Sequence, residues 1–350
     1  MPKIRVLIVD DAVVVRSRVS KILSNDPQLE VVGVAANGSI ALAKIPHVNP
    51  DVIVLDVEMP QMNGLETLKS IRQNYPLLPV IMFSTFIQTG ASATLEALSL
   101  GANDYATKPS NLGSVEAANQ HISQDLIPKI KLFGAAVNTP QAIAPNPITS
   151  PTTTQPADIV AIGVSTGGPN TLAVLLSQLP AELPVPILIV QHMPPMFTQL
   201  LAQRLADKCQ IRVKEAVPGA VLEPGHAWIA PGDFHLNIQQ HETFVKIATH
   251  QQPPENSCRP SVDVLFRSVA QVYRDRTLAV VLTGMGGDGL HGCKCIREAG
   301  GQILVQDKAS SVVWGMPGFV ANAGLADRIL PLDQMADAIL RRVSNNYYHI

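Results

Sequence analysis

The chain has 350 residues, a length that fits about two domains. Hydrophobic residues make up 46% of the sequence and charged residues only 15%, which excludes a disordered, highly charged chain. The formal net charge is −2, and basic and acidic residues are nearly balanced in both halves. Nothing in this charge distribution favours binding to nucleic acid.

The sequence also indicates neither a membrane-spanning helix nor a signal peptide. No apolar run reaches the roughly 18 residues that a membrane-spanning helix needs, so we expect no membrane insertion. The first residues, Met1 to Arg5, run directly into a strand-like segment, which is unlike a signal peptide. The four cysteines form no C-x-x-C pair and are typical of reduced thiols in the cytoplasm, with a metal site as the weaker alternative. We therefore expect a cytoplasmic protein.

A stretch without charged residues separates the two halves of the chain, between Lys131 and Asp158. Within it, residues 138–156 are rich in Pro, Thr, Ala and Gln and have no apolar period, which predicts a Pro/Thr-rich flexible linker. The alternative, an ordered surface loop within one domain, is uncommon at this length. We expect one domain at 1–125, a helix end and the linker at 126–156, and a second domain at 157–345.

Short apolar runs alternate with helix-like segments in both halves. Runs without polar alternation suit strands that are buried on both faces of a parallel sheet. The fold class is therefore predicted as α/β, with two doubly wound parallel-sheet domains, the first flavodoxin-like and the second Rossmann-like. Residues 220–248 carry Pro-Gly turn signals and predict a β-hairpin insertion. The other predicted strands are 4–9, 31–35, 52–55, 80–83, 104–106, 159–164, 187–191, 278–282 and 303–306.

Acidic side chains follow predicted strands in the first half. Asp10 and Asp11 follow the first strand, Asp56 follows the third, and Lys108 follows the fifth. Carboxyl ends of parallel strands meet at one edge, where three carboxylates repel one another unless a cation such as Mg²⁺ lies between them. A metal-bound carboxylate can accept a phosphoryl group, whose charge Lys108 can pair and which Ser84 can hydrogen-bond. In the alternative interpretation each Asp only caps a turn.

Over residues 1–125 these features resemble a response-regulator receiver domain. The resemblance implies that a sensor histidine kinase is the phosphodonor and that Asp56 is the phosphorylated residue. It also implies that Mg²⁺ is held by Asp11, Asp56 and the backbone carbonyl of Glu58, with Asp10 assisting.

The same resemblance assigns switch residues. Ser84 and Lys108 stand where receivers contact the phosphoryl group, and Tyr105 stands at the aromatic position that receivers use as a rotamer switch. Tyr105 can also be read as an ordinary half-buried strand tyrosine.

A serine, a histidine and an aspartate follow predicted strands in the second half. Ser165 lies in a glycine-flanked strand-to-helix turn, His192 follows the next strand, and Asp288 follows a later one. Serine is a weak nucleophile until a base takes its proton. His192 can be that base, and Asp288 can stabilise the imidazolium. The backbone N–H groups of Thr166 and Met285 are candidate donors to an oxyanion.

Each of these residues has a simpler interpretation. Ser165 could be a helix N-cap, and His192 an ordinary hydrogen-bonded histidine. Residues 284–289 fit the G-x-G-x-x-G dinucleotide fingerprint, with Asp307 further along the chain. That reading puts the Asp288 carboxylate beside a pyrophosphate and gives Ser165 and His192 no role. The order Ser, His, Asp also differs from the Ser, Asp, His order of α/β-hydrolases.

Four separated segments, 163–169, 190–194, 259–266 and 282–289, resemble the catalytic domain of the chemotaxis protein-glutamate methylesterases in the same order. The resemblance covers residues 157–342, and a receiver, a linker and this domain are the architecture of that family. It implies hydrolysis of glutamyl methyl esters on methyl-accepting chemotaxis receptors and deamidation of receptor glutamines. Arg259 and Asp263 would line the cleft, although Asp263 could equally cap a helix.

We expect no metal or other cofactor for the esterase chemistry, because the second half has no ligand cluster with zinc spacing. A rival from another class is a non-catalytic, phosphorylation-switched interaction module. The presence of Ser165, His192 and Asp288 together favours the enzyme, since a binding module has no use for all three.

Overall fold

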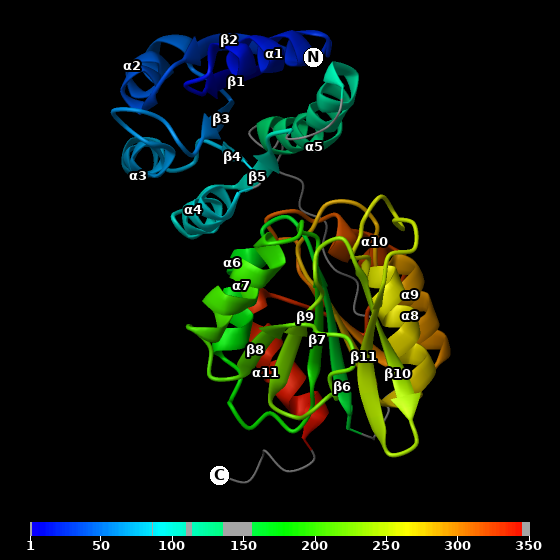
Figure 1. Ribbon diagram of the computed structural model, residues 1–350. Helices are drawn as coiled ribbons and strands as arrows, with labels where there is room; N and C mark the ends of the chain where they lie inside the picture. Colours follow the sequence, from blue (N-terminus) through cyan, green and yellow to red (C-terminus); the bar gives the residue numbers. More distant parts are fainter. Residues whose placement is uncertain (1, 86, 110–113, 136–155, 345–350) are drawn as a thin grey trace. The chain divides into compact units, whose positions relative to one another are not determined.

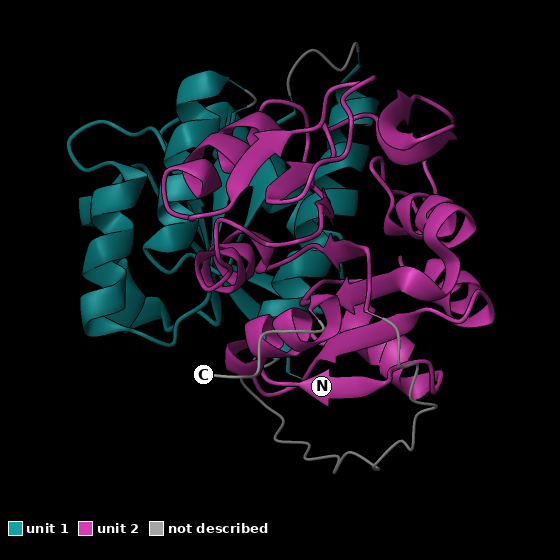
Figure 2. Cartoon of the chain, turned by 90° about the horizontal axis from the view of Figure 1, so that it is seen from below, with its two compact units in different colours: residues 1–143 teal, residues 144–350 magenta. Residues whose placement is uncertain are grey.

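The computed structural model describes residues 2–85, 87–109, 114–135 and 156–344. The chain divides into two compact units, residues 1–143 and 144–350 (Figure 2). Each unit has its own parallel sheet with helices between successive strands. The prediction of two doubly wound α/β domains is confirmed. Most of the predicted linker, residues 136–155, lies outside the described residues.

The first unit is built on a five-stranded sheet in the order β2-β1-β3-β4-β5, with every neighbouring pair parallel (Figure 1). This is the flavodoxin-like order, which leaves the carboxyl ends of β1 and β3 side by side. Its strands are β1 (Ile4–Val9), β2 (Leu29–Ala35), β3 (Val52–Asp56), β4 (Val80–Ser84) and β5 (Asp104–Thr107).

Helices cover both faces of this sheet, α1 and α5 on one side and α2, α3 and α4 on the other. A capping box begins α3, because the Asn63 side chain accepts from the Glu66 N–H at 2.9 Å while the Glu66 carboxylate accepts from the Asn63 N–H at 3.0 Å. The box fixes the loop that follows Asp56. The helices are α1 (Val13–Ser24), α2 (Gly38–Val48), α3 (Gly64–Asn74), α4 (Gln88–Ser99) and α5 (Val115–Ala135).

The second unit has a seven-stranded, all-parallel sheet in the order β14-β13-β12-β6-β7-β9-β8. The strands are β6 (Ile159–Val164), β7 (Ile187–Gln191), β8 (Arg212–Glu215), β9 (His226–Ile229), β12 (Thr277–Val281), β13 (Gln302–Gln306) and β14 (Arg328–Leu330). The order places β12, β6 and β7 next to one another near the centre.

The predicted hairpin insertion at 220–248 is partly wrong. Only β10 (His235–His241) and β11 (Phe244–His250) form an antiparallel hairpin. β9 instead joins the main sheet, because all four of its residues are buried, as in a strand covered on both faces. The hairpin packs against α8 (Val262–Tyr273).

The remaining helices of the second unit lie on both faces of its sheet. α8, α9 (Leu290–Glu298) and α10 (Met316–Asn322) share one face, and α6 (Gly168–Ser177), α7 (Phe197–Ala206) and α11 (Leu332–Val343) share the other. A short 3₁₀ helix, Arg274–Arg276, leads into β12. Within the described residues no helix is long and apolar enough to span a membrane.

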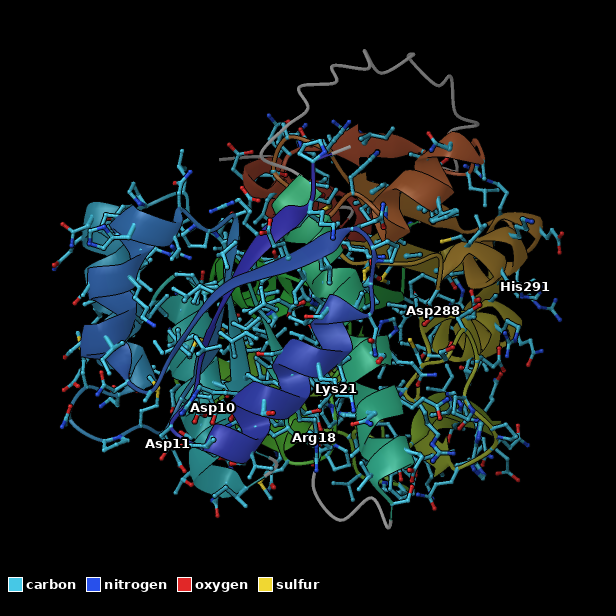
Figure 3. All side chains as sticks on the ribbon, turned by 90° about the horizontal axis from the view of Figure 1, so that it is seen from above. Asp10, Asp11, Arg18, Lys21, Asp288 and His291 are labelled. Atoms are coloured by element: carbon cyan, nitrogen blue, oxygen red, sulfur yellow. The ribbon has the colours of Figure 1, made fainter. Side chains whose placement is uncertain are left out.

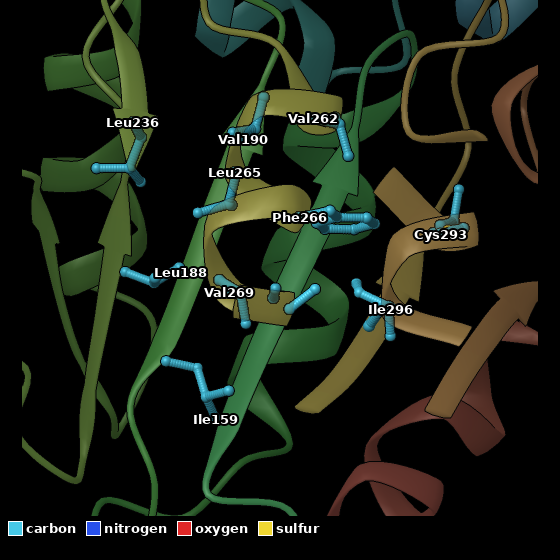
Figure 4. Packing of buried hydrophobic residues seen from close by; sticks show 14 of the residues in the cluster. Ile159, Leu188, Val190, Leu236, Val262, Leu265, Phe266, Val269, Cys293 and Ile296 are labelled. Carbon is cyan, nitrogen blue, oxygen red and sulfur yellow. The ribbon is translucent and has the colours of Figure 1, made fainter. Parts of the chain in front are cut away.

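The core between α8, α9 and the sheet holds the ends of these helices in place (Figure 4). The side chains of Val262, Phe266 and Val269 from α8 are fully buried against strand residues such as Ile159 and Leu188. Burying one such side chain contributes roughly 1.5–3 kcal/mol. The first turns of α8 and α9 are therefore rigid supports for the residues that precede them.

Candidate active site and phosphoacceptor pocket

In the first unit, the predicted acidic residues meet at the carboxyl ends of the strands. Asp10 follows β1 and Asp56 ends β3; both are buried, while Asp11 is exposed (Figure 3). One carboxylate oxygen from each of the three lies within 4.8 Å of the others. Oxygen ligands at this spacing fit a hard divalent cation such as Mg²⁺.

Lys108 is the basic side chain of this pocket. Its Nζ lies 2.7 Å from Asp10 Oδ2 and 2.8 Å from Asp56 Oδ2. Burial raises the pKa of Asp56 to about 6, although the charge of Lys108 opposes this rise. Three carboxylates around one ammonium group leave an excess of negative charge, so a bound cation would stabilise the ionised form of Asp56.

The loop after Asp56 needs glycine at position 64. A Cβ at Gly64 would lie 2.2 Å from the backbone oxygen of Asp56, so no larger residue fits without moving the end of β3. Asp11 and Glu58 line an open depression of about 610 Å³ beside this loop. The backbone of Glu58 therefore belongs to the same edge of the sheet as the carboxylates.

Ser84 and Tyr105 lie on the next two strands of the sheet. Ser84 ends β4 and is 1% exposed, with its hydroxyl 3.4 Å from the Thr85 carbonyl. Tyr105 is 8% exposed, so it is buried rather than half-buried, and Lys129 Nζ lies 5.1 Å from the centre of its ring. Burial raises the pKa of Tyr105 well above its usual range. Its role as a switch remains a prediction.

In the second unit, Ser165 and His192 follow adjacent strands at matching positions. Val164 pairs with Gln191 across β6 and β7, and the His192 N–H donates to the Val164 carbonyl at 3.2 Å. Gln191 Nε2 donates to the Ser165 carbonyl at 3.0 Å. A Cβ at Gly168 would come within 1.9 Å of Gln191 Oε1, so glycine there lets the amide reach the serine loop.

His192 and Asp288 form the central contact of the site. His192 Nε2 lies 2.8 Å from Asp288 Oδ2. Burial lowers the pKa of His192, but the hydrogen bond to Asp288 and the contact with Cys258 outweigh burial and raise the pKa to about 10. Burial likewise opposes ionisation of Asp288, but the His192 contacts lower its pKa to about 2. Both shifts favour the imidazolium–carboxylate pair.

Asp288 is held by donors from a loop and from two helix ends. It precedes α9, the helix that carries His291 (Figure 3), yet its oxygens accept mainly from the start of α8. A carboxylate with this many donors stays ionised and cannot rotate freely. Besides His192, the donors are Val262 N at 2.7 Å, Ser261 Oγ at 2.8 Å, Asn256 Nδ2 at 2.9 Å, Gly289 N at 3.0 Å and Asp263 N at 3.2 Å.

The other ring nitrogen of His192 faces a cysteine. Nδ1 lies 3.7 Å from Cys258 Sγ. Within the described part of the chain, the Ser165 hydroxyl makes no hydrogen bond to His192. Asp288 occupies Nε2, so Nδ1 is the ring nitrogen that faces away from this carboxylate.

The candidate oxyanion donors lie on two loops that Thr283 joins. The Thr283 hydroxyl donates to the Thr166 carbonyl at 3.0 Å and accepts from the Val313 N–H at 2.9 Å. Thr166 directly follows Ser165, and Met285 lies two residues after Thr283. Of the described residues, none accepts a hydrogen bond from the Met285 N–H.

The two residues expected in the cleft have other contacts. The Arg259 guanidinium donates to Asp233 Oδ1, with Nε at 3.0 Å, and to two backbone carbonyls. Asp263 is 4% exposed and accepts from the Gly292 N–H at 2.6 Å. It therefore caps a helix, as one of the two interpretations held, but the helix is α9 rather than its own.

Sequence reasoning missed the partners that hold the site. Asn256 donates from one amide to both Asp288 and Asp263, each at 2.9 Å, while Ser261 contacts Asp288 and Cys258 contacts His192. Asn256 has a φ of 53°, a conformation that Asn adopts more readily than most residues. An Asn-Ser pair before a Cys in a Pro-rich loop was the only signal that could have indicated this turn.

Comparison with known proteins identifies the family of each unit. The family model "CheB methylesterase" matches residues 160–339, and "Response regulator receiver domain" matches residues 6–120. The catalytic domain of the Thermotoga maritima CheB methylesterase, a solved structure, is 41% identical with a TM-score of 0.52, and the match covers 53% of this chain and 98% of that one.

Full-length relatives are similar over nearly the whole chain. A protein-glutamate methylesterase/protein-glutamine glutaminase of Trichodesmium erythraeum is 60% identical over 98% of this chain and 100% of its own length. One from a Nocardioides species is 48% identical over 98% and 96%. The match favours the esterase interpretation over the dinucleotide fingerprint. The chain therefore belongs to the protein-glutamate methylesterase/protein-glutamine glutaminase family, with a response-regulator receiver domain and a CheB methylesterase domain.

Proposed function

We propose that this protein is a phosphorylation-regulated hydrolase that removes methyl esters from glutamyl residues of methyl-accepting chemotaxis receptors and deamidates receptor glutamines. The observation that carries the proposal is the His192–Asp288 hydrogen bond of 2.8 Å, at a strand end directly beside that of Ser165. The protein would then act in chemotactic adaptation, in the cytoplasm, where the kinase and its ATP are.

In the proposed reaction, Ser165 Oγ attacks the glutamyl carbonyl while its proton passes to His192 Nδ1. The Asp288 carboxylate stabilises the imidazolium through Nε2. The carbonyl oxygen becomes an oxyanion, for which the Thr166 and Met285 N–H groups are the candidate donors. His192 then protonates the leaving methoxide, and methanol departs, or ammonia when the substrate is a glutamine.

Water completes the cycle. His192 takes a proton from water, the resulting hydroxide attacks the acyl-enzyme, and the product carboxylate leaves as Ser165 regains its proton. We propose that Arg259 and Asp263 act on the shape of the cleft and not on bond making, because Asp233 and Gly292 already occupy them.

In the receiver unit, we propose that a sensor histidine kinase supplies the phosphoryl group and that Asp56 accepts it. Asp11, Asp56 and the carbonyl of Glu58 would hold Mg²⁺, with Asp10 assisting. When bound, the ion would neutralise the phosphoryl oxygens during transfer. Lys108 would pair the added charge.

Two nearby side chains would sense that charge. Ser84 would turn its hydroxyl from the Thr85 carbonyl toward the phosphoryl group, and Tyr105 would follow it inward.

The deciding experiment is methanol release from methylated receptor membranes. The full chain is tested with and without a small phosphodonor such as acetyl phosphate, in the presence of Mg²⁺. Methanol release that rises with the phosphodonor supports the proposal. A chain that binds receptors but releases no methanol in either state would instead be the phosphorylation-switched interaction module.

A further inference from the structure

A thiol lies at the nitrogen that the proposed mechanism needs. Cys258 comes from the loop between β11 and α8, and the hydrolysis gives it no role. One ligand atom each from His192, Cys258 and Asp288 lies within 4.8 Å of the others. Imidazole and thiolate together are ligands that Zn²⁺ prefers and that Mg²⁺ and Ca²⁺ do not.

The distance between the two soft ligands fits zinc. A tetrahedral Zn²⁺ lies about 2.05 Å from a histidine nitrogen and about 2.3 Å from a cysteine sulfur, which separates the two ligand atoms by about 3.6 Å. His192 Nδ1 and Cys258 Sγ are 3.7 Å apart. The two ligand atoms therefore already have the separation that one shared ion requires.

The far side of the imidazole is also suited to a metal ligand. A metal-binding histidine usually donates its other ring N–H to a carboxylate, which fixes the tautomer and the ring plane. His192 Nε2 makes that contact with Asp288 at 2.8 Å. Because Val262 N and Ser261 Oγ also hold Asp288, the carboxylate would stay in this supporting position.

We propose that Cys258 Sγ and His192 Nδ1 form a Zn²⁺ site that inhibits the enzyme reversibly. Binding displaces the thiol proton and occupies the imidazole nitrogen that would accept the proton of Ser165. Two protein ligands leave the remaining positions to water, so the ion exchanges instead of serving as a structural centre. Cys258 is partly exposed, which gives the ion access. The inhibition rests on the proposed function, whereas the binding does not.

Binding is tested on the full chain in excess Mg²⁺, which keeps the receiver carboxylates occupied. Zn²⁺ is titrated in competition with a chromophoric chelator, and Co²⁺ is used as a spectroscopic substitute. We expect a thiolate-to-cobalt charge-transfer band in the parent protein. Cys258→Ser and Cys258→Ala should lose the band and bind Zn²⁺ at least tenfold more weakly. Cys209→Ala, which removes a half-buried thiol after α7, is the matched control and should behave as the parent.

Inhibition is measured as methanol release against Zn²⁺ concentration, each variant relative to its own metal-free rate. The parent and Cys209→Ala should be inhibited at least tenfold more strongly than the Cys258 variants. Equal zinc affinity in parent and Cys258 variants, or no charge-transfer band in the parent, would overturn the site. Absence of the cobalt band in the parent would overturn the site even if a substitution unfolds the chain, and the Cys209→Ala spectrum tests whether a second free thiol gives the band.

The remaining outcomes separate the site from the function. Binding at Cys258 without inhibition would overturn the inhibitory role. If the metal-free parent releases no methanol, the proposed function fails, while the binding result still decides the site.

Discussion

Asp263 and Asp288 cap the first turns of each other's helices. Asp288, just before α9, accepts from the Val262 N–H at 2.7 Å at the start of α8, and Asp263 in α8 accepts from the Gly292 N–H at 2.6 Å in α9. Asn256 joins the two carboxylates with one amide. The carboxylate that orients His192 is thus part of the packing of two helices.

The first prediction concerns Ser165, the proposed nucleophile. Ser165→Ala should lower methanol release by about 10⁴-fold or more, because the residual rate comes only from binding and oxyanion stabilisation. Ser177→Ala, an exposed serine on α6, is the matched control and should keep the parent rate. A rate for Ser165→Ala within tenfold of the parent would remove Ser165 from the mechanism.

The second prediction concerns the side-chain amide of Asn256, which donates to both Asp263 and Asp288. Asn256→Gly deletes the side chain but keeps a residue that tolerates a φ of 53°. We expect a loss of about 1 kcal/mol in the free energy of unfolding, since two carboxylates each lose a donor. We also expect a lower kcat with little change in KM, because the amide acts through Asp288. Denaturant unfolding and steady-state kinetics check both effects.

The control for that variant is Ser257→Ala, which alters the next residue of the same exposed loop. It should change neither stability nor kcat. If Asn256→Gly behaves in the same way, the amide does not position Asp288.

The third prediction concerns Asp56, the proposed phosphoacceptor. Asp56→Asn should incorporate no acid-labile phosphate from acetyl phosphate and Mg²⁺, as read by mass spectrometry of the intact protein. Asp51→Asn, just before the other end of β3, should incorporate as much as the parent. Removal of Mg²⁺ by a chelator should stop incorporation in both the parent and the control. Equal labelling of Asp56→Asn and the parent would contradict the assignment.

The fourth prediction is that the second unit acts without the receiver unit. A fragment of residues 157–345 contains the complete second sheet and Ser165, His192 and Asp288. We expect it to release methanol at a rate that acetyl phosphate does not change, whereas the full chain responds. A fragment that still responds to the phosphodonor would mean that the control does not pass through the receiver.

Much of the fold could be predicted because its inner strands are continuous apolar runs. Such runs form β6, β7 and β12, and also β1 before Asp10 and β3, which ends at Asp56. β8 reads Arg-Val-Lys-Glu at a sheet edge, and β14 has only three residues, so neither carries enough apolar signal to be recognised. β9 was mistaken for part of the hairpin because Pro-Gly turns flank it on both sides.

The residues of the site likewise include some that the sequence could predict and some that it could not. Ser165, His192 and Asp288 were predicted because strand ends share one edge in any parallel sheet. Asn256 and Cys258 lie in a loop without periodicity, and their approach to Asp288 and His192 depends on the path of that loop in space. Asp263 shows a further limit: its type and position left a cleft residue and a helix cap as equal alternatives, and neither indicated that the capped helix would be another one.

The mutual capping of α8 and α9 also bears on how the second unit opens in its native state. Amide hydrogens of Val262 and Asp263 are bonded to Asp288 just before α9, and that of Gly292 is bonded to Asp263 in α8, so fraying of either helix end releases donors of both. Their hydrogen exchange should therefore follow one common opening free energy. Each such opening frees the Asp288 carboxylate from these donors, so the exchange rate at these amides would report how often Asp288 loses the support that holds it beside His192.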